Sequence, residues 1–228
     1  MEHIIYTKII THLENNKILS DAQHGFRKNR SCETQLIATI NDFAQTLNDG
    51  KQLDIILLDF SKAFDKVNHR KLCLKLDHYG IRGKLLDWIK NFLSERTQWV
   101  VINGECSSIA EVKSGVPQGT VLGPLLFLVY INDLPERVKS TLRLFADDSY
   151  VYRIITCKED TIQLQNYLNA LLEREKEWSM EFHPDKCKLL IITRKINPIQ
   201  VDYHMHHYKL ESVNEAKYLW VLLLGNHT

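Results

Sequence analysis

Apolar residues recur along this chain with two spacings, one typical of amphipathic helices and one typical of buried strands. Helical spacing, together with Ser31 as an N-cap and Asp49-Gly50 as a stop, predicts helices over these stretches: 1–13, 31–49, 68–79, 83–93, 121–134 and 164–172. In the second of these helices, the apolar face is predicted to consist of Leu36, Ile37, Ile40, Phe43, Ala44 and Leu47.

Strand signals lie between these helices. The continuous apolar run 53–60, bounded by polar segments, predicts a strand that is buried on both faces. Asn103-Gly104 predicts a hairpin turn between 97–103 and 108–112, and a second hairpin is expected around Asp147-Asp148. Further strands are expected at 188–193 and 218–224. This order of helices and mostly antiparallel strands predicts an α+β fold.

The composition is that of a globular intracellular protein. The chain has 228 residues, of which 44% are hydrophobic and 25% charged, which is enough for one sizeable domain or two small ones. The longest apolar run, 121–131, is interrupted by Gly123-Pro124 and is shorter than the ~20 residues that span a bilayer. The N-terminus has polar and acidic residues where a signal peptide would be apolar. We therefore expect neither secretion nor membrane insertion.

Cysteine usage and net charge narrow the function classes. The five cysteines are scattered and form no CxxC pair, which argues against a disulfide framework or a zinc module. The formal net charge is +1, whereas a freestanding nucleic-acid binder is usually more basic. Composition alone therefore does not indicate a nucleic-acid partner.

Three carboxylates are placed unusually. Asp59 ends the buried strand, and Asp147 and Asp148 occupy the tip of a predicted hairpin. If the two strands pair, the three carboxylates converge, and such a like-charged cluster needs a cation. Oxygen ligands without cysteine or histidine favour Mg²⁺. The alternatives are an ordinary surface turn for Asp147-Asp148 and a helix N-cap for Asp59.

Longer motifs surround these carboxylates. In chain order they read QHGFRKNRSCETQL, LLDFSKAFDKVNHRKLCLKL, SGVPQGTVLGPLLFLVYINDLP, LRLFADDSYVYR and HPDKCKLLIITR. The first resembles a fingers segment of reverse transcriptases, and the other four resemble successive palm motifs. Their order and spacing resemble those of non-LTR (LINE-like) retrotransposons, because retroviral enzymes carry a tyrosine-methionine pair before the two aspartates. The resemblance covers nearly the whole chain.

The resemblance implies a right-hand polymerase palm with partial fingers. Residues 1–50 would be partial fingers, and residues 51–228 the palm, with a fingers insertion near 80–112. It also implies an RNA-directed DNA polymerase that extends a DNA primer with dNTPs on an RNA template, using two Mg²⁺ ions for which Mn²⁺ could substitute. An RNA-templated RNA polymerase shares the palm carboxylates but is disfavoured by Phe64 at the sugar position.

The resemblance assigns roles to individual residues. Asp59, Asp147 and Asp148 would bind the metal ions, and Lys186 would donate a proton to the leaving pyrophosphate. Phe64 would lie under the sugar of the incoming nucleotide and exclude a 2′-hydroxyl.

Two further groups of residues would bind substrate. Gln118 would bond template or nucleotide edges, and Gly119 would allow close backbone approach. Arg27 and Arg30 would meet the triphosphate with their planar guanidinium groups. A plainer interpretation of these residues is also open. Phe64 would then be a core phenylalanine, the segment SGVPQG an ordinary turn, and Arg27 and Arg30 solvated surface arginines.

Two departures from the family pattern bear on activity. The last palm strand usually reads KYLGV, whereas this chain has Trp220 in place of the glycine, which could crowd the primer-holding strand or mark a segment that has diverged or is out of frame. The family's first fingers motifs would precede Met1, and its thumb would follow Thr228. The alternative function is therefore a catalytically inactive remnant palm that at most binds nucleic acid.

Overall fold

The continuous apolar run forms the central strand β1, Gln52–Leu58, in the computed structural model, which describes residues 1–135 and 140–225. This strand belongs to a five-stranded sheet with the order β11-β8-β1-β7-β6. The other four strands of the sheet are β6 Thr141–Phe145, β7 Asp148–Ile155, β8 Lys188–Ile192 and β11 Glu211–Val213. All neighbouring pairs are antiparallel except β11 and β8.

The chain divides into two units, which are described separately. One unit consists of Met1–Leu19 and Lys62–Asn132, and the other consists of Ser20–Ser61 and Asp133–Thr228. The five-stranded sheet lies in the second unit. The assignment of fingers to 1–50 and palm to 51–228 stays a prediction.

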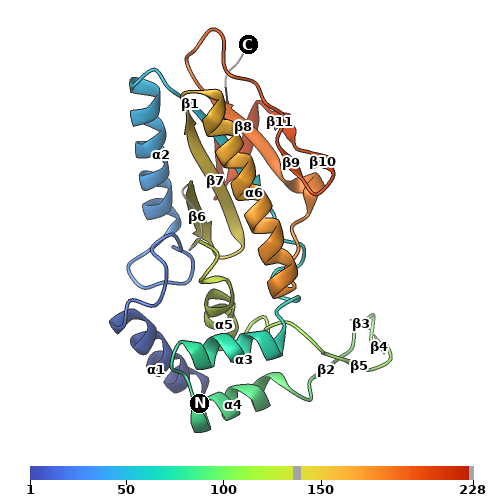
Figure 1. Cartoon of the computed structure of the whole chain (residues 1–228). Helices are drawn as coiled ribbons and strands as arrows, with labels where there is room; N and C mark the ends of the chain where they lie inside the picture. Colours follow the sequence, from blue (N-terminus) through green and yellow to red (C-terminus); the bar gives the residue numbers. More distant parts are fainter. Residues whose placement is uncertain (136–139, 226–228) are drawn as a thin grey trace. The chain divides into compact units, whose positions relative to one another are not determined.

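Two long helices cover the sheet of the second unit. Helix α2, Cys32–Asn48, lies on one face, and helix α6, Lys158–Trp178, lies on the other (Figure 1). Because both faces are covered, β1 is apolar along most of its length, as the sequence predicted. The exceptions are Gln52 and Asp54, which are both fully buried; Asp54 accepts hydrogen bonds from Gln52 (2.8 Å) and from the Tyr203 hydroxyl (2.7 Å). Burial raises the pKa of Asp54 above its ordinary value.

The start of α2 is as predicted, but its buried face is not. Ser31 caps the helix through a reciprocal pair of hydrogen bonds with Thr34. The prediction that Ile37 and Ile40 belong to the apolar face is wrong, because these side chains are 69% and 52% exposed. The residues of α2 that are buried are Gln35, Thr39, Phe43 and Thr46.

Tyrosine hydroxyl groups on the strands that face α2 explain why polar residues of this helix are buried. The side-chain amide of Gln35 donates to the Tyr218 hydroxyl at 3.2 Å, and the hydroxyl groups of Thr39 and Tyr150 share a hydrogen bond. Buried tyrosine hydroxyls need such partners. A periodicity argument counts only apolar residues, so it correctly included Phe43, Leu36 and Leu47 but missed the buried polar residues of the same face.

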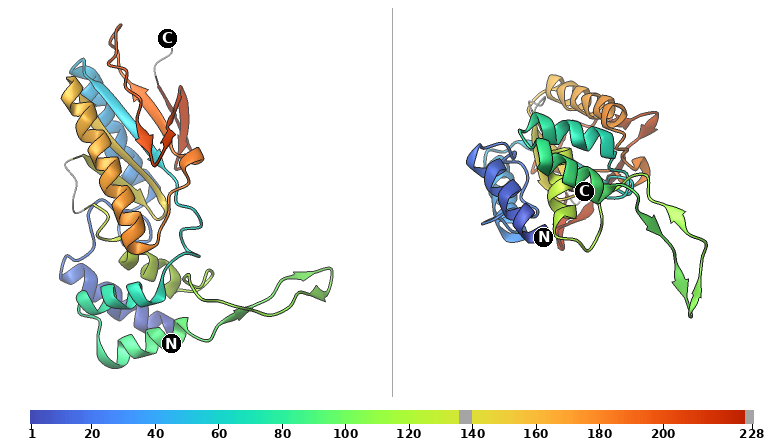
Figure 2. Two further views of the ribbon diagram at one scale, coloured as in Figure 1. Left: turned by 45° about the vertical axis from the view of Figure 1, so that its right-hand side comes forward. Right: turned by 90° about the horizontal axis from the view of Figure 1, so that it is seen from below.

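The first unit consists of helices and one long hairpin. Its helices are α1 Glu2–Asn15, α3 His69–His78, α4 Gly83–Leu93 and α5 Leu122–Ile131. Helix α5 is buried on nearly all sides and contacts both α1 and α3. The hairpin is built from the short pairs β2 Thr97–Gln98 with β5 Ala110–Glu111 and β3 Val101–Ile102 with β4 Glu105–Cys106. It extends away from these helices (Figure 2) and turns at Asn103-Gly104, as predicted.

The last segment is a hairpin rather than the single strand predicted for 218–224. Strands β12, Glu215–Tyr218, and β13, Val221–Leu224, pair around a two-residue loop of Leu219 and Trp220. Both loop residues have positive φ, 45° and 68°, a conformation that favours glycine at the second position. The remaining short elements are β9 His204–Met205, β10 Tyr208–Lys209 and the 3₁₀ turn Pro184–Lys186.

The α+β class and the mostly antiparallel sheet packed on helices are confirmed. Within residues 1–135 and 140–225, no helix has the length and apolar character needed to cross a membrane. All five cysteines are free thiols.

The Leu219-Trp220 loop yields a stability prediction. The Trp220 side chain is 87% exposed, and its ring contacts Lys217, whose Nζ lies 4.3 Å from the ring centroid. A residue with a Cβ is sterically strained in the left-handed conformation of Trp220. Replacing Trp220 by glycine relieves this strain and should therefore raise the free energy of unfolding by about 1 kcal/mol. Urea unfolding measures the change. Trp220→Ala is the control, because it removes the ring but keeps the Cβ; a Trp220→Gly chain no more stable than Trp220→Ala would contradict this account of the loop.

Candidate active site

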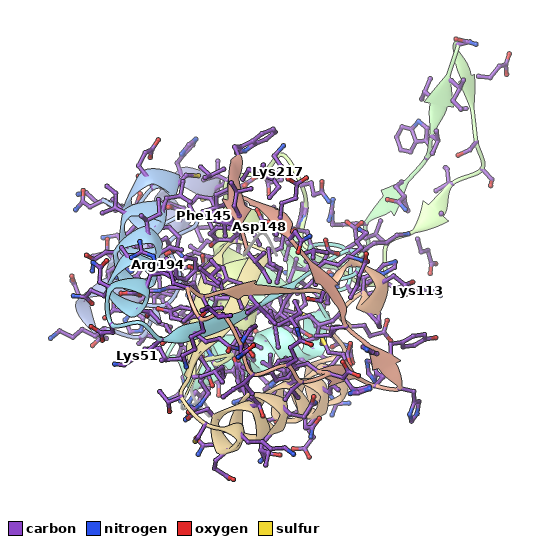
Figure 3. The ribbon with its side chains drawn as sticks, turned by 90° about the horizontal axis from the view of Figure 1, so that it is seen from above. Lys51, Lys113, Phe145, Asp148, Arg194 and Lys217 are labelled. Atoms are coloured by element: carbon purple, nitrogen blue, oxygen red, sulfur yellow. The ribbon has the colours of Figure 1, made fainter. Side chains whose placement is uncertain are left out.

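The pairing of β1 with β7 places the predicted metal ligands at one end of the sheet. Leu58, the last residue of β1, pairs with Ser149, so one further step along the register puts Asp59 opposite Asp148. Strands β6 and β7 form a hairpin in which Phe145 pairs with Asp148, leaving Ala146 and Asp147 as the loop. Figure 3 shows Asp148 beside Phe145 at this turn. Asp59 and the Asp147-Asp148 pair, which are distant in sequence, therefore lie at the same end of two neighbouring strands.

Electrostatics shows that the three carboxylates are close enough to interact. The pKa of Asp148 is raised, first by burial and then by the negative charges of Asp147 and Asp59. Like charges held together in this way favour protonation or a bound cation. The register of β1 and β7, rather than the sequence motif alone, therefore relates the Asp147-Asp148 turn to Asp59.

A third segment holds Asp59 from its other side. The backbone N–H of His183 donates to the Asp59 carbonyl at 2.8 Å, and the Ser61 N–H donates to the Glu181 carbonyl at 2.8 Å. The rings of Phe60 and Phe182 stack with centroids 4.4 Å apart. These contacts pair the residues after β1 with the segment before the 3₁₀ turn.

This pairing brings Lys186 to the carboxylates. Lys186 ends the 3₁₀ turn, and its Nζ lies 3.4 Å from Oδ1 of Asp59. Both side chains are substantially exposed, so the ion pair adds little stability. Lys186 is therefore the one cation among the predicted site residues that contacts one of the three aspartates.

The carboxylates of Asp59, Asp147 and Asp148 are suitable ligands for a hard divalent cation, although the three side chains do not form a complete coordination shell. The three groups offer oxygen atoms only, which suits Mg²⁺ or Mn²⁺. The nearest thiol, Cys187, is buried, accepts the Asp59 backbone N–H at 3.5 Å, and has its pKa raised to about 11. Among the described residues, no three carboxylate, imidazole or thiol groups already stand as a complete set of metal ligands.

The predicted triphosphate-binding arginines lie in the same unit and have internal partners. Nη1 of Arg27 donates to the Ser20 carbonyl at 2.7 Å, and its side chain is largely buried. Arg30 donates to the Asp21 carbonyl at 2.7 Å and pairs with the carboxylate of that residue. Both arginines therefore brace their own loop, and their binding of a triphosphate stays a prediction.

The other predicted nucleotide-binding residues lie in the first unit. The ring of Phe64 stacks on Phe127 with centroids 4.2 Å apart, which fixes its orientation. Gln118 and Gly119 are exposed, and the amide of Gln118 donates to Oδ1 of Asp65 at 3.1 Å. Gly119 has φ +78°, and a Cβ there would meet nothing within 4 Å.

Asp65 is a residue whose role the sequence did not reveal. Besides bonding Gln118, its carbonyl accepts the Ser114 hydroxyl at 2.8 Å. A Cβ on Gly115 would lie 2.8 Å from that same carbonyl, so only glycine fits this approach. Asp65 thus orders the loop that carries Gln118. The sequence signal was its place one residue after Phe64, which is too weak to assign a role.

The second missed residue is Gln23. It lies in the segment QHGFR, where only the charged residues attracted attention, yet it is 3% exposed and its amide bonds the backbone of Ala146. A buried glutamine cannot be told from a surface one by sequence pattern alone. Its partner is 123 positions away.

Comparison with known proteins provides a family match and a shared fold. A family model described as reverse transcriptase (RNA-dependent DNA polymerase) matches residues 2–221. The chain is 29% identical to a probable RNA-directed DNA polymerase from transposon BS of Drosophila melanogaster, over 97% of this chain and 26% of that protein. It is 30% identical to the RNA-directed DNA polymerase from mobile element jockey of Drosophila funebris, over 98% of this chain and 25% of that protein.

A solved structure shares the fold. Apo telomerase from Candida tropicalis superposes with a TM-score of 0.63 at 12% identity, covering 98% of this chain and 39% of that one. This likeness shows the right-hand polymerase fold. The chain spans about a quarter of the length of the curated relatives it matches.

Carboxylate repulsion yields a pH-dependent prediction. The raised pKa of Asp148 means that the folded chain binds this proton more tightly than the unfolded chain does. Ionisation of Asp148 therefore costs stability, and the cost appears as the pH rises through the unfolded value of ~4 and beyond. Without metal, Asp148→Asn should melt at a higher temperature than the parent chain at pH 7, and the difference should vanish at pH 3.

The control is Asp185→Asn, which removes an exposed carboxylate of the same unit. This variant should not reproduce the gain at pH 7. Melting is followed by circular dichroism in the presence of a chelator. Equal melting temperatures for Asp148→Asn and the parent chain at pH 7 would show that neither burial nor the neighbouring charges disfavour the ionised form of Asp148.

Proposed function

The chain belongs to the reverse transcriptase (RNA-dependent DNA polymerase) family, and from this premise we propose that it is the polymerase core of a non-LTR retrotransposon. The observation that supports this most is the register of β1 and β7, which sets Asp59 opposite Asp148 and beside the loop of Asp147. The proposed reaction joins dNTPs to the 3′-hydroxyl of a DNA primer on an RNA template inside the cell.

In this proposal the three aspartates are the catalytic carboxylates. Asp59, Asp147 and Asp148 would hold two Mg²⁺ ions, which would supply Lewis-acid stabilisation of the negative charge that develops in a phosphoryl transfer. The raised pKa of Asp148 supports this role, because the site has excess negative charge that a cation relieves. Mn²⁺ has the same preference for oxygen ligands.

Lys186 is proposed to move a proton. Its ammonium group lies 3.4 Å from the Asp59 carboxylate, which supports this role, because a nucleotide bound through metal ions at Asp59 would lie near it. A lysine can donate a proton to a leaving group when its ammonium nitrogen lies within hydrogen-bond distance of the leaving oxygen. Arg27 and Arg30 are proposed to bind the triphosphate by exchanging their present internal partners for phosphate oxygens.

Phe64, Gln118 and Gly119 are proposed to select and orient the nucleotide. The stack on Phe127 supports a rigid position for the Phe64 ring, which an excluding surface requires. Gln118 is exposed, with an amide held by Asp65, so it can present hydrogen-bonding groups to a base or sugar. The alternative, an inactive remnant palm, keeps the fold and binds nucleic acid without catalysis.

Primer extension separates the two functions. When flanked by the further fingers and thumb segments of the family, the chain, in excess over an RNA template annealed to a DNA primer at low salt, should add dNTPs in the presence of Mg²⁺. Asp147→Asn should abolish addition, because it removes a ligand charge from the metal site without breaking a structural contact. Asp202→Asn, an exposed carboxylate away from the turn that pairs with Lys209, is the matched control and should retain activity. A folded parent chain that binds Mg²⁺ and template but adds no nucleotide would favour the remnant.

Sugar selection tests Phe64. Replacing it by valine removes the ring and should raise the ratio of kcat/KM for ribonucleotides over deoxyribonucleotides by 10-fold or more, on the order of the discrimination that pocket shape supplies. Phe92→Val is the control, because Phe92 is also a stacked, half-buried ring of the first unit, against Trp88. An unchanged ratio in Phe64→Val would assign Phe64 to packing alone.

A further inference from the structure

The loop that carries Asp147 contains a residue in an unfavourable conformation. Ala146 directly precedes Asp147 and has φ +55°, in the left-handed region that residues other than glycine rarely adopt. Because Ala146 and Asp147 form the whole loop between β6 and β7, any change in this dihedral redirects both aspartates. Such a conformation persists only where surrounding contacts hold it.

One side chain bonds both backbone groups of this residue. Oε1 of Gln23 accepts the Ala146 N–H at 2.9 Å, and Nε2 of Gln23 donates to the Ala146 carbonyl at 3.3 Å. The same Oε1 accepts the Gly25 N–H at 2.7 Å. Gln23 is almost fully buried, so water does not compete for these bonds.

The backbone around Gln23 is fixed to the hairpin as well. The His24 N–H donates to the Leu144 carbonyl, and the Leu144 N–H donates to the Ala22 carbonyl, each at 2.9 Å. A Cβ on Gly25 would lie 2.3 Å from the Ala146 nitrogen, so only glycine allows the two backbones to approach this closely. The segment therefore lies against the hairpin edge with Gln23 directed at the loop.

We propose that Gln23 is a positioning residue for the metal-binding carboxylates, holding Ala146 in the left-handed conformation that directs Asp147 and Asp148 to the metal ions. This inference rests on the proposed function. The segment that contains Gln23 also carries Arg27 and Arg30, so the same contact links the proposed triphosphate loop to the carboxylate loop. Residues that orient metal ligands typically affect metal affinity 10–100-fold when they are replaced.

The test measures Mn²⁺ affinity of the 228-residue chain by water-proton relaxation. Gln23→Met keeps the length of the side chain and removes its hydrogen bonds, and it should weaken Mn²⁺ binding by about 10-fold or more. The control is Gln35→Met, the same substitution at a fully buried glutamine of the same unit, whose amide bonds Tyr218 rather than the loop. This control is expected to lower stability, as any lost buried hydrogen bond does, and to leave the Mn²⁺ affinity unchanged.

A second substitution separates positioning from general destabilisation. Glycine adopts positive φ without steric cost, so Ala146→Gly should make the loop less dependent on Gln23. The double variant Gln23→Met/Ala146→Gly is expected to regain most of the lost affinity. None of these substitutions changes the net charge, so differences in Mn²⁺ binding reflect geometry. If Gln23→Met does not fold, Gln23→Asn keeps a buried amide with shorter reach and should show the same loss.

The outcomes are distinguishable. Equal Mn²⁺ affinity in the parent chain and in folded Gln23→Met or Gln23→Asn overturns the positioning role while leaving the proposed function intact. A loss of the same size in Gln35→Met, or no regain in the double variant, assigns Gln23 to packing alone. A parent chain that binds no Mn²⁺ overturns the metal site itself, and with it both proposals.

Discussion

The antiparallel pairing of β1 with β7 is the constraint on which the rest of the site depends. Its register sets which residues meet at the end of the sheet, and a shift by one position would turn every side chain of β1 to the opposite face. A polar residue of this buried strand opposes such a shift, because a slip would turn the fully buried Asp54 away from the Tyr203 hydroxyl that donates to it. This contact therefore helps to fix where Asp59 and Asp148 stand.

Convergence of like charges opposes folding, and contacts on two sides offset this cost. On one side, the residues after β1 pair with the segment that leads to Lys186, through His183 and the stacked rings of Phe60 and Phe182. On the other side, Gln23 and the close approach of Gly25 hold the Ala146 loop. The segments that carry the three carboxylates are thus held in place by contacts with other parts of the same unit, as a preorganised metal site requires.

Much of this could be predicted from the sequence, because the relevant signals are local. The apolar run of β1, the Ser31 cap and the Asn103-Gly104 turn each specify their own element, and the aspartates stand out as charges beside buried strands. The polar residues on the inward face of α2 could not be predicted, since Gln35 and Thr39 face tyrosine hydroxyls contributed by distant strands. The same reason hid Gln23, whose partner Ala146 is brought to it only by the folded chain. The Leu219-Trp220 turn was missed because its residues carry no turn signal of their own.

The central claim is that the three aspartates form one metal site at the end of β1 and β7. Crystals of the chain soaked in Mn²⁺ and measured at the manganese absorption edge test it most directly, because anomalous scattering locates the ions without reference to activity. The account predicts anomalous peaks within ligand distance of the Asp59 carboxylate and of at least one oxygen of Asp147 or Asp148. Peaks confined to other carboxylates, with these three left without an ion at saturating Mn²⁺, would contradict it.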